Sequence, residues 1–433
     1  MNSYRAKQIL KQVAGITGLL PSIQKMRIRL RRKRLDKIYE QHISRIKNKE
    51  VIRVLFLVSE NSKWCSQSLY DAFQKDNRFD PFIVIARLAR PGQTIDKDKQ
   101  EYDENIHFFK TREMTVYDGY DFNELVDTDL RIFSPDIVFY QQPWEIAPLH
   151  DVEQVSQYAL TCYNPYGFLI GNLEDVHYNT IFQQYMWITF AFSEEHRKLF
   201  RKYAPLGDSN VIAVNYPKLD VYLEDLPSGE NFWPRLRSDN IKRVIWAPHF
   251  AYNSGIMYGT FDWNYQFMLD LARKHQNIDW IVKPHPRLRS ELVYQNTMTL
   301  EEVNSYFKEW QDLPNAKLYE QGEYFKVMMT SDAMITDCGS FLAEYLPTQK
   351  PILHLINPSS VGFNEIGRKI IKDFYKINNI AELSDTIDEV IVNKNDYLKN
   401  TRADAINIIV IPGQSGSDSI KSIISDVLTK NSE

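Results

Sequence analysis

Three short segments of the chain combine histidine, lysine, arginine and serine in patterns that suit the binding of phosphate groups. In the first, Lys283, His285 and Arg287 alternate with two prolines, which places up to three donors close together on a stiffened loop. Such a group suits a diphosphate that must be held while one phosphate leaves. In the second, His249 follows Trp246-Ala-Pro, and it could contact a phosphate, serve as an acid or base, or be satisfied by neighbouring backbone.

The third segment is Thr336-Asp337-Cys-Gly339-Ser340, where an apolar run gives way to a helical pattern. Backbone N–H groups at the start of that helix could bind phosphate oxygens, and the Ser340 hydroxyl could add another donor. The plainer interpretation is an ordinary helix cap, in which Asp337 or Ser340 satisfies the first turn. Glu344, one turn later, could hydrogen-bond a ribose or face water.

These segments need a scaffold that brings them together, and the spacing of the apolar runs predicts a parallel sheet. The second half of the chain is expected to form strands at residues 243–247, 278–283, 333–336 and 352–355. Helices are expected between them, near residues 262–274, 300–311, 322–330 and 341–348. Open α/β sheets bind ligands beyond the carboxyl ends of their strands, so the three segments should meet at one edge.

A second set of strands precedes this one. It is predicted at residues 51–58, 82–86, 136–140, 160–163, 187–192 and 211–214. Residues 224–231 contain turn formers without apolar periodicity and are the best linker. We therefore expect an α/β fold of two Rossmann-like domains facing a cleft, an N-terminal domain at 51–225 and a C-terminal nucleotide-binding domain at 241–425. Trp144, which follows a strand of the first domain, suits an acceptor glycan or a loop that caps the core.

Residues 1–50 form a basic extension, with 14 Lys and Arg against three acidic residues and a net charge of +11, which leaves −15 for residues 51–433. Ile9, Val13, Ile16 and Leu20 recur at helical spacing before Pro21. A second helix should follow, with an incomplete apolar stripe at Ile23, Met26, Leu30 and Ile38. Its cations are expected to bind an anionic membrane surface: Arg27, Arg29, Arg31, Arg32, Lys33 and Arg34. The alternatives are a helical hairpin packed on the body, or an oligomer contact.

Composition excludes several other classes. The three cysteines are scattered without CxxC spacing, which indicates neither a disulfide framework nor a zinc site, and no metal or cofactor is expected. No run of about 18 apolar residues and no export signal is visible, so we expect a cytoplasmic protein at the inner face of the membrane. The acidic body and the lack of a reader motif argue against nucleic-acid binding.

Taken in order, the motifs resemble the CDP-glycerol glycerophosphotransferase family, whose members build teichoic-acid-like polymers. The resemblance rests on Trp246-Ala-Pro, Lys283-Pro-His285-Pro, Ser331-Asp-Ala-Met-Ile-Thr-Asp337-x-x-Ser340-Phe-x-x-Glu344-Tyr and Lys350-Pro. It covers roughly residues 130–425 and is strongest in 240–356. The late Gly413-Gln-Ser-Gly416-Ser-Asp418-Ser is also similar to the closing segment of that family.

The resemblance implies the GT-B arrangement of two Rossmann-like domains, with cytidine against the second. His285 would contact the donor phosphates, and Ser340 with the turn after Asp337 would complete the pocket. The acceptor hydroxyl would attack the phosphorus bonded to glycerol and expel CMP, helped by positioning and charge stabilisation. The predicted catalytic residues are therefore His285, His249 and Ser340, and the predicted donor-binding residues are Lys283, Arg287, Asp337, Gly339, Ser340 and Glu344.

One departure from the family concerns the acceptor side. Better-known members carry a Trp-His-Gly stretch whose histidine is the proposed general base, whereas this chain has Cys162-Tyr-Asn164-Pro-Tyr166. Asn164 cannot act as a base, and Tyr166 is a poor one with an ordinary pKa of about 10. Acceptor-side candidates are Trp144, Asn164, Tyr166 and His177. The proton acceptor is left open among His177, Glu174, Asp175 and His249.

The predicted function is a transferase that moves glycerol phosphate, or a related alditol phosphate, from a CDP-linked donor. The acceptor would be a cell-surface glycan or a lipid-linked molecule, and CMP would be released. Two alternatives stay open: a nucleotide-sugar glycosyltransferase of capsule or lipopolysaccharide synthesis on the same scaffold, and a non-catalytic assembly protein tethered to the membrane.

Overall fold

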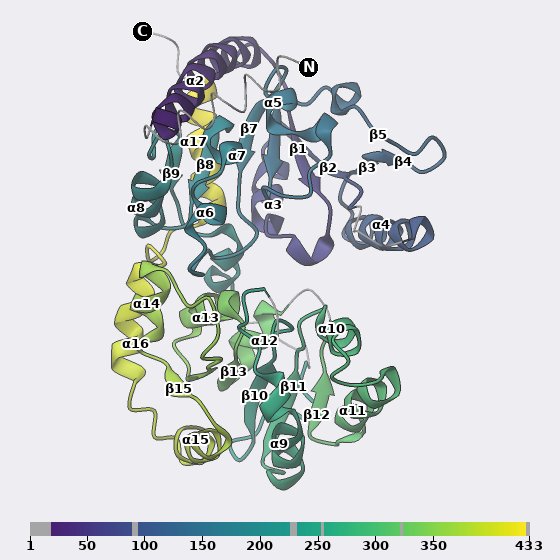
Figure 1. Cartoon of the computed structure of the whole chain (residues 1–433), viewed down its shortest axis with the longest axis vertical. Coiled ribbons are helices and arrows are strands. Elements are labelled where there is room, and N and C mark those ends of the chain that lie inside the picture. Colours follow the sequence, from purple (N-terminus) through teal and green to yellow (C-terminus); the bar gives the residue numbers. More distant parts are fainter. Residues whose placement is uncertain (1–18, 89–93, 226–231, 253–254, 321–323, 430–433) are drawn as a thin grey trace. The chain divides into compact units, whose positions relative to one another are not determined.

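The structure is a computed structural model that describes residues 19–88, 94–225, 232–252, 255–320 and 324–429. The chain forms two compact units. Unit 1 contains the described parts of residues 1–167, 174–218 and 416–433, and unit 2 contains those of 168–173 and 219–415. Both are α/β, and each is built on its own parallel sheet (Figure 1).

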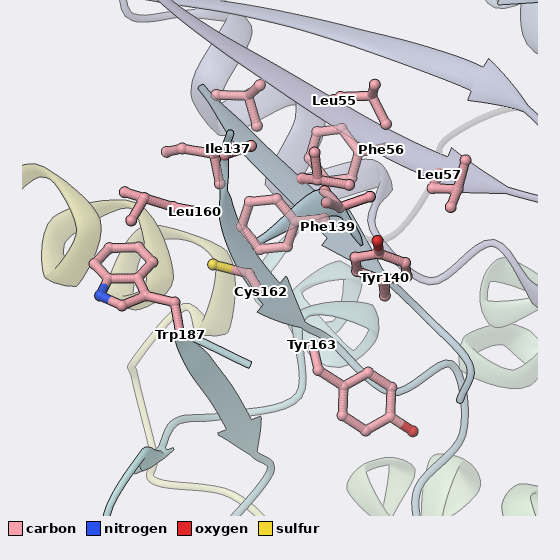
Figure 2. Close-up of a cluster of buried hydrophobic side chains, with 14 of the residues drawn as sticks. Leu55, Phe56, Leu57, Ile137, Phe139, Tyr140, Leu160, Cys162, Tyr163 and Trp187 are labelled. Atoms are coloured by element: carbon pink, nitrogen blue, oxygen red, sulfur yellow. The ribbon is translucent and has the colours of Figure 1, made fainter. Parts of the chain in front are cut away.

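The sheet of unit 1 has seven strands in the order β3-β2-β1-β6-β7-β8-β9, and every neighbouring pair is parallel. Its strands are β1 (Ile52–Val58), β2 (Phe79–Ile85), β3 (Val116–Asp118), β6 (Ile137–Tyr140), β7 (Leu160–Tyr163), β8 (Ile188–Ala191) and β9 (Val211–Ala213). A separate hairpin joins β4 (Tyr120–Asp121) and β5 (Val126–Asp127). The central strands are apolar on both faces because helices cover both, and Phe56 and Phe139 stack at 5.0 Å (Figure 2).

The helices of unit 1 are α2 (Leu19–Ile46), α3 (Gln67–Gln74), α4 (Ile95–Lys110), α5 (Val152–Val155), α6 (Glu174–His177), α7 (Ile181–Tyr185), α8 (Glu194–Tyr203) and α17 (Gly416–Thr429). The last of these belongs to unit 1 although it ends the described chain, because Ile420, Ile424 and Leu428 are buried in the core of this unit. α17 packs against α3 and α2. The predicted boundary at 425 therefore differs from the structure, where unit 2 ends at Ser415.

The sheet of unit 2 has six parallel strands in the order β12-β11-β10-β13-β14-β15. They are β10 (Lys242–Ala247), β11 (Ile278–Val282), β12 (Ala316–Leu318), β13 (Ala333–Thr336), β14 (Ile352–Leu355) and β15 (Tyr375–Ile377). The helices are α9 (Phe261–Lys274), α10 (Leu288–Tyr294), α11 (Leu300–Asp312), α12 (Phe325–Thr330), α13 (Gly339–Tyr345), α14 (Glu365–Ile371), α15 (Ile380–Thr386) and α16 (Lys399–Ala405).

The predicted central strands of both sheets agree with the observed ones within three residues at each end. It missed β3, β12 and β15, which all lie at sheet edges and have three residues each. Such short edge strands carry no periodic signal of their own. The predicted linker at 224–231 falls mostly outside the described residues, as does the predicted first helix before residue 19.

Helix α2 corrects the predicted arrangement of the basic extension. The predicted break at Pro21 is not found, because Leu20 and Pro21 both lie in the first turn of α2, where the missing proline N–H costs no hydrogen bond. The face at Ile28, Leu35 and Tyr39 is buried in unit 1, and the Tyr39 hydroxyl donates to the Tyr185 carbonyl at 2.6 Å. Within the described residues, no helix is long and apolar enough to cross a membrane.

The apolar stripe predicted on α2 lies on the opposite face. Ile23, Met26 and Leu30 are exposed at 38%, 54% and 58%. Only Ile38 of the stripe packs against the core, and it is partly buried. The helix therefore has two apolar faces, one that attaches it to unit 1 and one left toward solvent.

These two faces allow a matched test of packing. We expect Leu35→Ala to lower the free energy of unfolding by about 2–4 kcal/mol, because Leu35 is fully buried and its loss leaves a cavity. Leu30→Ala, the same change on the exposed face, should alter it by less than about 0.5 kcal/mol. Urea unfolding followed by circular dichroism measures both, and equal losses would mean that α2 does not pack through the Leu35 face.

Candidate functional site

The predicted phosphate site lies where the strand order of unit 2 changes direction. From β10 the chain continues outward to β11 and β12, and it then returns to the other side of β10 with β13, β14 and β15. The loops that follow β10 and β13 therefore leave in opposite directions, and open α/β sheets bind ligands at such a point. The three predicted segments follow β10, β11 and β13.

Hydrogen bonds join all three loops. The backbone N–H of His285, after β11, donates to the carbonyl of Pro248 at 3.0 Å. The backbone N–H of His249, after β10, donates to the carboxylate of Asp337, after β13, at 2.6 Å. The expected convergence of the segments at one edge of the sheet is therefore what the structure shows.

Asp337 was predicted to bind phosphate, but its side chain points into the protein and does not face a ligand. Its side chain is buried and accepts three hydrogen bonds, from the His249 backbone and from the backbone and hydroxyl of Thr260, both at 2.7 Å. Burial raises the pKa of this carboxyl to about 7, although these hydrogen bonds favour the ionised form. A carboxylate would also repel a phosphate. Asp337 thus holds the loop of His249 in place instead of facing a ligand.

His249 and His285 form the same kind of hydrogen bond with the backbone. The Nδ1 atom of His249 accepts the N–H of Ala251 at 3.0 Å, and Nδ1 of His285 accepts the N–H of Arg287 at 3.1 Å. Because a backbone N–H can only donate, the neutral form of each ring carries its proton on Nε2. Burial lowers the pKa to about 3 for His249 and about 2 for His285, with nearby cations adding to the effect. Both rings are neutral hydrogen-bond donors at pH 7.

Aromatic rings support these donors. The ring of Phe250 lies 4.5 Å from His249 and 4.4 Å from His285, between centroids, and the Arg287 guanidinium stacks on Phe250 at 4.4 Å. Arg287 also forms an ion pair with Glu291. Its predicted role as a phosphate ligand would require it to exchange that carboxylate for the phosphate.

Lys283 and Glu344 meet through a tyrosine. The Lys283 ammonium lies 5.1 Å from the centre of the Tyr324 ring, and the Tyr324 hydroxyl donates to Glu344 at 2.5 Å. Lys283 is 8% exposed and Glu344 is 1% exposed. The suggestion that Glu344 faces water is therefore wrong. Its carboxylate is instead tied to Tyr324.

Gly339 begins α13, and its position explains why the residue is glycine. A β-carbon there would lie 3.1 Å from the Tyr258 ring. Tyr258 in turn stacks on Phe363 at 5.2 Å and donates to the Gly362 carbonyl at 2.7 Å. Ser340 is partly exposed, and its hydroxyl lies 3.5 Å from the sulfur of Cys338. The helix-cap interpretation fails for Asp337, and the Cys338 N-cap makes no side-chain cap hydrogen bond.

The acceptor-side candidates lie in unit 1 and have different surroundings. Trp144 and Tyr166 form an edge-to-face pair at 6.0 Å, and both are partly exposed. Asn164 is fully buried and donates to the Ser66 hydroxyl at 2.8 Å. His177 ends the short helix α6, with its ring 6.0 Å from Tyr178. The structure thus brings Trp144 and Tyr166 together and places Asn164 in the core.

Several residues of the site could not be predicted from the sequence. Phe250, Tyr258, Thr260 and Tyr324 enter it only through tertiary packing. The one available clue was Gly259, whose added β-carbon would lie 2.9 Å from the His249 carbonyl oxygen and so could not be accommodated.

Comparison with known proteins shows which family the segment around the site is similar to. Residues 176–376 match the model of the family described as CDP-Glycerol:Poly(glycerophosphate) glycerophosphotransferase. Over these residues, which are fewer than half of the chain, the protein is similar to that family. The match contains β10, β11 and β13 with all three loops of the site. It confirms the resemblance found in the sequence and supports a transferase.

Solved structures confirm the fold. MnaA of S. aureus with UDP is 13% identical, with 88% of this chain and 98% of that one covered and a TM-score of 0.55. The UDP-GlcNAc 2-epimerase of Neisseria meningitidis bound to UDP-GlcNAc is 17% identical, with 87% and 100% covered and a TM-score of 0.54. A variant of the wall teichoic acid polymerase TagF is 11% identical, with 94% and 98% covered and a TM-score of 0.50. No curated protein matches the chain in sequence.

At these identities the likeness concerns the fold alone, which is of the GT-B type with two Rossmann-like domains. The glycerophosphotransferase family model supplies the chemical class, because it matches the sequence itself over the part of the chain that holds the site.

The buried histidines of the chain predict how its stability depends on pH. His249, His285 and His354 have pKa values of about 3, 2 and 4 in the fold and 6.5 as ordinary groups, so they gain protons on unfolding between about pH 4 and 6.5. Asp337 opposes them, because its pKa of about 7 means that it loses a proton on unfolding. Since the histidines outnumber it, stability should fall as the pH drops through this window.

Urea midpoints measured from pH 7 to 4.5 check this expectation. His285→Gln should lose less stability on acidification than the unmodified protein, while His107→Gln, at an exposed histidine, should behave like it. Parallel curves for all three proteins would show that folding does not lower the pKa of His285.

Proposed function

We propose that the chain transfers glycerol phosphate, or a related alditol phosphate, from a CDP-linked donor to a cell-surface glycan or lipid-linked acceptor, with release of CMP. The observation that carries the proposal is the pair of neutral Nε2–H donors at the direction change of the unit 2 sheet, inside the segment that matches the glycerophosphotransferase family. Neutral donors and one buried cation, Lys283, suit a diphosphate whose charge shifts during the reaction.

In this mechanism the acceptor hydroxyl attacks the phosphorus bonded to glycerol. A new P–O bond forms, the P–O bond to the CMP phosphate breaks, and the hydroxyl proton passes to a base. His285, His249 and Lys283 stabilise the charge that grows on the leaving phosphate, and the Ser340 hydroxyl adds a donor. His249 is not that base, because its Nδ1 accepts a backbone N–H and Nε2 already holds the proton.

Substitutions of His285 test whether this residue acts as a hydrogen-bond donor or as a base. His285→Ala should lower the transfer rate by about 10²–10³-fold, the usual cost of removing one such donor. His285→Gln should recover part of that loss, because its amide N–H can replace Nε2–H. His107→Ala, at an exposed histidine of unit 1, serves as the control and should leave the rate unchanged.

The assay follows a donor that carries a phosphorus label next to glycerol. Label in the product together with glycerol supports the proposal. A product that gains a sugar from a nucleotide sugar without phosphorus would indicate a glycosyltransferase, and failure to bind CDP or any CDP-linked donor would favour a non-catalytic assembly protein. Equal rates for His285→Gln and His285→Ala would contradict the donor role.

We further propose that α2 attaches the protein to the inner face of the cell membrane. The supporting observation is its solvent face, where Ile23, Met26 and Leu30 lie among exposed cations. The cations on that face are Arg27, Arg29, Lys33 and Arg34. Two of the six cations predicted to bind the membrane form ion pairs within the protein instead. Arg31 pairs with Glu153 at 3.2 Å, and Arg32 pairs with Asp36 at 2.7 Å.

Sedimentation with anionic vesicles tests this attachment. The double variant Met26→Glu, Leu30→Glu should lose most binding, because it places charge in the apolar part of the face. Ile132→Glu, at a residue of unit 1 that is 69% exposed, controls for added charge and should bind normally. Added salt should weaken binding of the unmodified protein. Undiminished pelleting of the double variant would exclude this face.

A further inference from the structure

The hairpin of β4 and β5 projects beyond β3, an edge strand of the unit 1 sheet (Figure 1). Its base is fixed to that sheet, because the N–H of Gly119 donates to the Ile85 carbonyl and the N–H of Thr128 donates to the Gly119 carbonyl, both at 2.9 Å. A β-carbon at Gly119 would lie 2.5 Å from the Ile85 carbonyl oxygen, so this close approach requires glycine. The hairpin is therefore held in place at its base.

Leu125, at the tip of the hairpin, combines two unfavourable features. Its φ angle of 56° is left-handed, a conformation that is costly for a bulky side chain and that asparagine or glycine adopts more easily. Its side chain is also 58% exposed, and that of the next residue, Val126, is 53% exposed. The fold gains little from a leucine here, so we look for a contact outside the chain that buries it.

The surroundings of this apolar tip are acidic. Residues 116–129 contain five aspartates and glutamates and no lysine or arginine. Asp129 pairs with Arg131, and Lys99, which packs on the hairpin, pairs with Asp103 at 2.8 Å. Within the part of the chain that the structure describes, the other four acidic side chains form no ion pair: Asp118, Asp121, Glu124 and Asp127. A partner that fits the tip should be both apolar and basic.

The solvent face of α2 has this complementary character. Its apolar residues Ile23, Met26 and Leu30 are exposed, and they alternate with cations that are exposed as well. These cations are Arg27, Arg29, Lys33 and Arg34. Neither the hairpin tip nor this face of α2 is covered within the chain, so each is free to meet the other on a second copy.

We propose that the hairpin tip of one copy docks on the solvent face of α2 of a second copy. A tip of this size buries less than the roughly 800 Å² per partner of a stable interface, so the contact is weak and reversible. Two copies that exchange it reciprocally form a closed dimer. The proposed membrane attachment uses the same face of α2, so an anionic membrane would displace the hairpin. This competition rests on the proposed attachment, whereas the docking itself does not.

Leu125→Asn is the sharpest variant, because asparagine tolerates the left-handed conformation and the melting temperature should not fall. We expect it to raise the dissociation constant of self-association at least tenfold (about 1.4 kcal/mol). Leu236→Asn, at a leucine of unit 2 that is 79% exposed, is the matched control and should associate like the unmodified protein. Sedimentation velocity of the full chain over a range of concentrations measures the average mass, and added salt should lower it.

A mixing experiment tests which surfaces meet. The double variant Met26→Glu, Leu30→Glu keeps the hairpin and loses its docking face, and Leu125→Asn does the reverse. Neither variant should self-associate, but an equimolar mixture should, because one intact hairpin and one intact α2 face are then present. If hairpin met hairpin or α2 met α2, one of the variants would still self-associate and the docking proposed here would be wrong.

Three other results would overturn the inference: an unmodified protein that stays monomeric at every concentration, self-association that Leu125→Asn leaves unchanged, or a mixture that remains monomeric. Vesicle sedimentation separates the docking from the membrane attachment. Leu125→Asn should pellet with anionic vesicles as the unmodified protein does, because its α2 face is intact. Self-association that depends on Leu125, in a protein that no anionic vesicle binds, would support the docking and reject the proposed attachment.

Discussion

The buried carboxylate of Asp337 is the interaction on which the site of unit 2 depends. It accepts hydrogen bonds from two residues that lie 11 positions apart, His249 and Thr260, and so closes the loop that joins β10 to α9 against the end of β13. Parallel strands alone would leave these loops to diverge at the direction change of the sheet. The carboxylate therefore converts a gap between two loops into a fixed position for the His249 backbone.

The same interaction has an energetic cost that the site tolerates. Burial raises the pKa of Asp337 to about 7, so this carboxyl would be more stable as an ion in water. The neighbouring imidazoles are in the opposite situation, because burial lowers their pKa values and keeps them neutral. Among these four groups only Lys283, which is 8% exposed, is a cation, so it is the one that would offset the negative charge of a phosphate.

Sequence patterns predicted the parts of this structure that depend on local order, and missed those that depend on packing. Central strands such as β1 and β13 are continuous apolar runs, so their positions and the loops after them could be predicted. The edge strand β12 has three residues and only one buried position, Ala316, so no periodicity distinguishes it. The role of Asp337 could not be predicted, because a carboxylate at that position is equally suited to cap a helix or to hold a distant backbone.

Helix α2 is a second case in which the sequence pattern predicted the element but not its packing. Its periodic pattern indicated an amphipathic helix correctly, yet periodicity cannot tell which of two apolar faces packs inward. Leu35 and Tyr39 are buried, while Met26 and Leu30 are exposed. What decides between them is the partner surface, since only the first face can meet the Tyr185 carbonyl and the core beneath it.

The proposed transfer requires a base that accepts the proton of the acceptor hydroxyl. Four residues were proposed for this role: His249, Glu174, Asp175 and His177. His249 has no free lone pair for a proton. Asn164, which is not one of the four, is buried against Ser66. The three that remain, Glu174, Asp175 and His177, share the single helix α6. That helix directly follows the segment 168–173, which belongs to unit 2 and is held there by hydrogen bonds from Asn364 to the carbonyl of Leu169 and from Asn172 to that of Gly362.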